Sequence, residues 1–174
     1  MPWYYYLSDV TLKRIEAQVL NTFYNNHNPD VKWNSSKLLQ MTRMATIFEN
    51  QIDDWFKTLS PIIHFEEWDK SPPQELIYNL QARVLGLRSW LYRPFVCYAI
   101  HNHNHSHSEG EEENNLSQIQ IDKFVQKCIE CCFHIIQSKP TRHRHHGTYY
   151  AARNVLSSAL LIIAAVRAED WWIT

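Results

Sequence analysis

Glycine is scarce in this sequence, with 3 residues among 174. Glycine is the usual residue where a turn needs a backbone conformation that other side chains disfavour. The chain therefore has few glycine-built turns. Its 7 tryptophans instead suggest large packed side chains.

A surplus of positive charge is also lacking, since 17 basic residues face 18 acidic ones and the net charge is -1. Binding to nucleic acid normally shows as a basic surplus clustered on one face, so nucleic acid is not expected to be the main partner. The 45% hydrophobic and 13% aromatic content excludes a disordered chain. We expect one domain over residues 1–174.

Long hydrophobic runs and a secretory signal are absent as well. The longest apolar run, residues 159–166, is far shorter than the ~20 residues that span a bilayer. The opening MPWYYYLSDVTLKRIE lacks the three features of a signal peptide, which are a basic start, a continuous apolar stretch and a cleavage site between small residues. We therefore expect a soluble intracellular protein without a membrane partner, whose cysteines are reduced thiols.

No convincing strand pattern interrupts the helical periodicity. The clearest helical stripe alternates steps of three and four residues: Leu38, Met41, Ala45, Phe48, Ile52, Trp55 and Leu59. Pro94 is expected to break or kink a helix that starts after Pro73, because proline removes a backbone donor. The fold class is therefore all-α, an array of about six antiparallel helices: 7–24, 35–59, 76–93, 95–100, 121–135 and 149–166, the last with Tyr149, Ala152, Leu156, Ala159, Ile163 and Val166 on its inner face.

Residues 101–115, HNHNHSHSEGEEENN, contain no large apolar side chain. We expect a long mobile loop rich in His and Glu, within the single domain. Its alternating histidines, His101, His103, His105 and His107, could chelate a metal ion. A flexible loop gives no fixed ligand geometry, so we expect no metal there.

Cysteines and histidines elsewhere suggest chemistry but fit packing better. Cys128 and Cys132 of the segment CIECC follow the apolar spacing of a helix, where thiols pack like small apolar side chains. A catalytic site could use His64 with Glu66, Glu67 and Asp69, or His143–His146 with Ser157. The sequence has no GxSxG, HExxH or glycine-rich phosphate loop. We expect no catalytic residue, no cofactor and no metal.

Three segments in order resemble the fungal-specific transcription factor domain, the middle homology region of binuclear zinc-cluster transcription factors. They are WYYYLSDVTLKRIEAQVL at 3–20, LRSWLYRPFVCYAI at 87–100 and RHHGTYYAARNVLSSALLIIAA at 144–165. The first is similar to the aromatic-rich entry helix of the family, the second to its "L-x-R-P-F" helix end, and the third to its "R-H-H-G-T" helix start.

The resemblance implies an all-helical regulatory domain of a nuclear factor, which modulates transcription through protein partners or a small apolar ligand and is not an enzyme. The positions that match the family motifs are expected to be structural: Arg93, Pro94, Arg144, His146, Gly147 and Arg153. Arg93 and Arg153 are expected to form buried charge-assisted hydrogen bonds, so that loss of Arg153 destabilises the fold. Thr148 is expected to cap the last helix, and Tyr149 to begin its buried stripe.

The resemblance covers only the C-terminal part of the family domain, and the chain has no zinc-cluster module, so we expect no direct DNA binding. Either the chain is a piece of a larger factor, or it is a stand-alone relative. Missing neighbours would leave apolar faces exposed on helices such as 38–59, which favours self-association or a protein partner. The alternatives are a small helical enzyme acting on an apolar small molecule, and a plain protein-interaction module.

Overall fold

The computed structural model describes residues 2–25, 35–65, 74–102, 112–138 and 145–168. All regular elements within these ranges are helical, which confirms the all-α prediction. They are α1 (Pro2–Leu20), the short π-helical η1 (Asn21–Asn25), α2 (Ser35–Lys57), α3 (Glu75–Asn102), α4 (Glu112–Gln137) and α5 (His145–Arg167).

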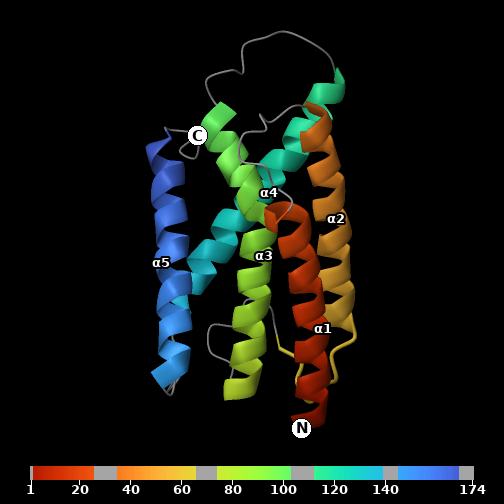
Figure 1. Ribbon diagram of the computed structural model, residues 1–174, viewed down its shortest axis with the longest axis vertical. Helices are drawn as coiled ribbons and strands as arrows, with labels where there is room; N and C mark the ends of the chain where they lie inside the picture. Colours follow the sequence, from red (N-terminus) through yellow and green to blue (C-terminus); the bar gives the residue numbers. More distant parts are fainter. Residues whose placement is uncertain (1, 26–34, 66–73, 103–111, 139–144, 169–174) are drawn as a thin grey trace.

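The five α-helices run alternately up and down (Figure 1). The long α3 occupies the centre, α1 and α2 lie on one side of it, α5 lies on the other, and α4 crosses obliquely. The most extensive packing is between α3 and α4, and α5 packs mainly on α4 with a smaller contact to α3. Because α5 is at the edge of the bundle, only one of its faces is covered by these two helices.

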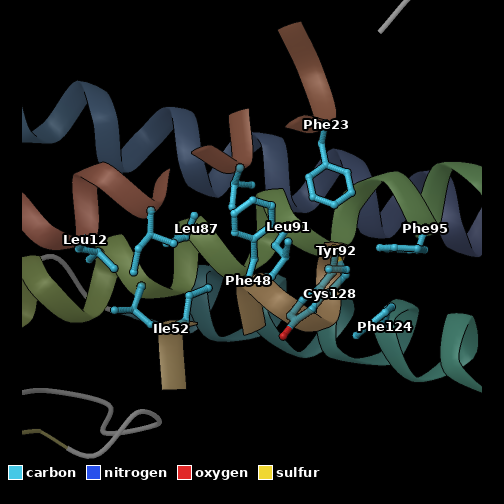
Figure 2. Packing of buried hydrophobic residues seen from close by; sticks show 14 of the residues in the cluster. Leu12, Phe23, Phe48, Ile52, Leu87, Leu91, Tyr92, Phe95, Phe124 and Cys128 are labelled. Atoms are coloured by element: carbon cyan, nitrogen blue, oxygen red, sulfur yellow. The ribbon is translucent and has the colours of Figure 1, made fainter. Parts of the chain in front are cut away.

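Apolar stripes from α1, α2, α3 and α4 meet in one core (Figure 2). The whole predicted stripe from Leu38 to Leu59 is buried. Its last member, Leu59, follows the end of α2 at Lys57, so the helix predicted over 35–59 ends two residues early. We expected this apolar face of α2 to be exposed because neighbouring helices were missing. That expectation is wrong, because α1, α3 and α4 pack on α2. Val10 of α1 and Leu76 of α3 are exposed, although they share the apolar spacing of buried residues in the same helices, such as Ile15 and Leu80.

Polar contacts also fix α1 to its neighbours. The indole Nε1 of Trp55 in α2 donates to the carbonyl oxygen of Ser8 at 3.0 Å. The carboxylate of Asp9, mostly buried, lies 3.1 Å from Nη1 of Arg83 in α3. These contacts set the orientation of α1 while its apolar side packs on the core.

The helix that contains Pro94 does not end there. Proline inside a helix costs ~3 kcal/mol because a hydrogen bond is lost and the ring crowds the preceding turn. Around Pro94 the side chains of Leu91, Phe95 and Val96 are almost completely buried, and burying each contributes ~1.5–3 kcal/mol. Tertiary packing thus outweighs the local penalty, and the predicted helices 76–93 and 95–100 are one helix, α3.

Several predicted boundaries also need correction. α3 extends to Asn102 and α4 begins at Glu112, so the loop predicted over 101–115 is helical at both ends. Its central residues, 103–111, lie outside the described ranges. α5 begins at His145, which places Thr148 inside the helix, and the capping role predicted for Thr148 is wrong.

Candidate functional site

A network of charged and hydroxyl groups joins α2, α3 and α4. Oε1 of Glu49 accepts a hydrogen bond of 2.5 Å from the Tyr92 hydroxyl and another from Nζ of Lys127. Nη2 of Arg88 donates to Oδ1 of Asp53 at 2.8 Å, and its Nη1 lies 3.4 Å from the Tyr92 hydroxyl. Three helices are therefore tied together by charge-assisted hydrogen bonds.

Electrostatics within this network favour the ionised form of Glu49. Burial raises the pKa of its carboxyl, but the hydrogen bonds from Lys127 and Tyr92 outweigh burial, so that the net pKa is below the ordinary value. Burial, with the hydrogen bond to Glu49, raises the pKa of Tyr92 far above that of a free phenol. The charges are already paired with one another, which suits a structural role better than acid–base catalysis.

Thiols and hydroxyls form a second buried cluster between α3, α4 and α5. Sγ of Cys132 lies 3.7 Å from Oγ of Ser89, and Sγ of Cys128 donates to the Ser89 carbonyl oxygen at 3.6 Å. Ser158 of α5 also hydrogen-bonds Cys132. The hydrogen bond to Cys132 and burial both raise the pKa of Cys128.

These cysteines are completely enclosed, and all four cysteines of the chain are free thiols. The prediction that Cys128 and Cys132 pack as small apolar residues is confirmed. A reactive thiol needs access to solvent, which this cluster does not have.

The face of α5 toward the bundle combines small side chains with the larger Leu161 and Ile162, which are partly buried against the core. Ala151, Ser158 and Ala165 recur every seven residues on this face, and Ser158 and Ala165 are buried. Their small size lets the helix lie close to α4 and α3, and Ser158 reaches Cys132 there. The inner side of α5 is therefore held both by apolar packing and by the hydrogen bond of Ser158 to Cys132.

The opposite face of α5 also carries large apolar side chains, and these are exposed. Its central row, here called the outer stripe, alternates steps of four and three residues: Tyr149, Arg153, Leu156, Leu160, Ile163 and Arg167. The four apolar members are each 53–66% exposed, and the neighbouring Tyr150 and Val166 are exposed too. The predicted inner face of this helix, including Tyr149, Leu156 and Ile163, is therefore the outer one, and that prediction is wrong.

The family-motif positions do not come together in one site. Pro94 is buried in α3. Arg93 is half-buried there, and its enclosed Nε has no hydrogen-bond partner among the described residues. Gly147 and His146 lie in the first turn of α5, and Arg144 lies outside the described ranges.

Arg153, the remaining motif position, is exposed on the outer stripe. The expectation that it forms buried hydrogen bonds is wrong, because the covered side of α5 is the opposite one. We therefore expect Arg153→Ala to change the free energy of unfolding by less than ~0.5 kcal/mol. Urea denaturation followed by circular dichroism measures this. A loss of several kcal/mol would show that Arg153 has a buried partner after all.

Predicted metal and catalytic groups gain no support from their positions. Among the residues that the structure describes, no three His, Cys, Asp or Glu side chains are placed to hold a metal ion. His101 is exposed, with Nδ1 at 2.7 Å from the carbonyl oxygen of Cys97. His64 is exposed and packs edge-on against Phe56. Ser157 is half-buried, and its Oγ donates to the carbonyl oxygen of Asn154 at 3.1 Å. The remaining members lie outside the described ranges or have no described side chain: His103, His105, His107, Glu66, Glu67, Asp69 and His143–His146.

By length and composition α5 also passes as a membrane span. The segment Tyr149–Arg167 is the one described helix that is long and apolar enough, and only 11% of it is buried. One such helix is weak evidence for a membrane protein. The polar Arg153 and Asn154 interrupt its first half, and its inner face packs on α4.

No family model, no curated protein and no solved structure matches this chain. Two exposed apolar rows with helical spacing lie within the described residues: the outer stripe of α5 and, shorter, Trp3, Tyr6, Leu7 and Val10 at the start of α1. The outer stripe is the longer of the two. It is therefore the candidate functional site, and it is an interaction surface rather than a pocket.

Proposed function

We propose that this chain is a helical protein-interaction module that acts through the outer stripe of α5, and that its role is transcriptional regulation in the nucleus. The observation that carries the proposal is the exposure of Leu156, Leu160 and Ile163 on a helix whose other face already packs on the bundle. The regulatory role and the nucleus come from the resemblance to the fungal-specific transcription factor domain.

Energetics support a binding role for this stripe. Covering one large apolar side chain contributes ~1.5–3 kcal/mol, and contiguous apolar patches on soluble proteins mark sites of interaction. Association itself costs several kcal/mol, because the two molecules lose translational and rotational freedom. A partner therefore has to cover the whole outer stripe to bind with useful affinity. With a net charge of -1 the chain lacks the basic surplus that binding to DNA phosphates requires. We therefore propose that it influences transcription by binding a protein partner.

A reporter assay tests the regulatory role. The whole chain is fused to a zinc-cluster DNA-binding module in yeast, and reporter output is compared with that of the module alone. We expect the chain to change the output and Leu160→Glu to abolish the change, because a charge in the outer stripe opposes its burial. Ile119→Glu is the matched control, since Ile119 is an equally exposed apolar residue (63%) on α4. Equal output from the fusion and the module alone would contradict the regulatory role.

A further inference from the structure

We propose that the partner of the outer stripe is a second copy of this chain, with the two α5 helices antiparallel about a two-fold axis at the level of Ser158. This inference rests on the proposed function, since both use the same surface of α5. It goes beyond that function by naming the occupant and the register.

The outer stripe is complementary to itself in one direction. In an antiparallel pair centred at the level of Ser158, Leu156 lies opposite Leu160 of the second copy, and the reverse contact follows by symmetry. In the same way Tyr149 lies opposite Arg167 of the second copy, and Arg153 lies opposite Ile163, because each pair is equally spaced about position 158. The alternating steps of four and three residues are those of a coiled-coil seam, which keeps the row in contact along the helix.

Charge selects the antiparallel direction over the parallel one. A parallel pair would place Arg153 against Arg153 and Arg167 against Arg167, and like charges in contact are destabilising. In the antiparallel pair Arg167 lies over the ring of Tyr149 of the other copy, an arrangement in which a guanidinium and an aromatic face attract. The two Arg153 side chains are then about 15 Å apart along the axis, where salt screens their repulsion. The nearest like charges, Arg153 and Arg167 of the other copy, are offset by four residues, about 6 Å, instead of lying directly opposite one another. The helix dipoles also oppose one another favourably.

The position of α5 in the bundle permits this pairing. α5 lies at the edge of the molecule (Figure 1) and packs on α4 and α3 only through its inner face, where Ser158 and Ala165 are buried. To span a bilayer, α5 would have to detach its inner face from the bundle, and Ser158 would lose its hydrogen bond to Cys132. A second protein surface covers the outer stripe and leaves the inner face undisturbed.

The size of the surface sets the expected strength. α5 has 23 residues and is therefore about 34 Å long. One helix face offers less than the ~800 Å² per partner of a standard interface. We therefore expect a reversible dimer with a dissociation constant in the micromolar range, rather than an obligate one.

Sedimentation equilibrium of the whole chain across the micromolar range tests the dimer. We expect wild type to pass from monomer to dimer, and Leu160→Glu to weaken the dimer at least ~10-fold, a change of ~1.4 kcal/mol. Ile119→Glu should dimerise like wild type, because Ile119 lies on α4. Circular dichroism of each variant establishes that the fold is kept. Wild type that stays monomeric, or a dimer that Leu160→Glu leaves intact, overturns the inference.

Disulfide cross-linking tests the register. Under mild oxidation a mixture of Tyr149→Cys and Arg167→Cys chains should form a mixed dimer, while Tyr149→Cys alone should not, since its two copies would be about 27 Å apart. Cross-linking of Tyr149→Cys to itself would indicate a parallel pair and overturn the proposal. Wild type controls for the four native cysteines.

These results separate the inference from the proposed function. A monomer that still changes reporter output through Leu160 overturns the second copy as partner and leaves the interaction module standing. A monomer that binds phosphatidylcholine vesicles through Leu160 overturns it in favour of a lipid surface. A dimer without any reporter effect supports self-association and contradicts the regulatory role.

Discussion

Phe124→Ala should lower the free energy of unfolding by about 3–5 kcal/mol, the usual loss for a large aromatic side chain in a core. Phe124 is completely buried on α4. Its ring stacks on Tyr92 with centroids 5.4 Å apart and packs on Phe95 at 4.9 Å, and both partners belong to α3 (Figure 2). The substitution removes the centre of the largest helix–helix contact and leaves a cavity between α3 and α4.

Thermal or urea unfolding measures this effect. For a chain of this length 1 kcal/mol corresponds to ~2–4 °C in Tm, so a drop of roughly 6–20 °C is expected. The matched control is Phe133→Ala on the same helix, where the ring is 48% exposed and the loss should be smaller. Similar losses for the two variants would contradict the packing of α4 on α3 described above.

Glu49→Gln should be the most costly of the polar substitutions, with a loss of about 1–3 kcal/mol. The change removes the negative charge to which both Lys127 and Tyr92 donate. Lys127 is then left half-buried beside the Tyr92 ring without its counter-charge. Glu130→Gln is the matched control, because Glu130 is exposed on α4 and accepts only an exposed amide hydrogen bond from Gln126.

The same substitution should change how stability depends on pH. The pKa of Glu49 is lower in the folded chain than its ordinary value of 4.5, so the unfolded chain binds more protons near that value. Glu49 therefore contributes stability that is fully present above pH 4.5 and is lost as the pH falls through the folded pKa. Urea midpoints measured from pH 7 to pH 3 should fall less steeply for Glu49→Gln than for wild type. Parallel curves would show that Glu49 is not paired in the folded chain.

Self-association and stability should respond to different residues of this protein. Phe124 and Glu49 belong to contacts among α2, α3 and α4, whereas Leu160 lies outside the core. Leu160→Glu is therefore expected to change association without unfolding the chain. This separation is what makes the outer stripe testable as an interaction surface.

Periodicity in the sequence was sufficient to predict most helices and much of the core. The spacing of seven apolar residues over 35–59 fits a helix with one apolar face, and all seven are buried, six of them in α2 and Leu59 just after it. Cys128 and Cys132 share the spacing of Val125 and Ile135, and all four are buried in α4. Local spacing is enough in these cases because only one face of each helix is apolar.

Pro94 and the Glu49–Lys127 pair show where local sequence rules are insufficient. The local rule for proline predicts that the helix ends at Pro94. Instead α3 continues past Pro94, because its contacts with α4 stabilise the helix on both sides of the proline. Glu49 and Lys127 are 78 positions apart, and nothing in the spacing of either residue indicates the other. Both features depend on which helices become neighbours.

The sequence by itself determined that this protein is a bundle of amphipathic helices with thiols in its core. Only the tertiary structure decided which face of α5 is inside. That helix is apolar on both sides, so its periodicity is compatible with either orientation. The inner face packs Leu161 and Ile162 on the core, and its small Ser158 and Ala165 allow close approach to α4 and a hydrogen bond to Cys132. Leu156, Leu160 and Ile163 therefore face outward.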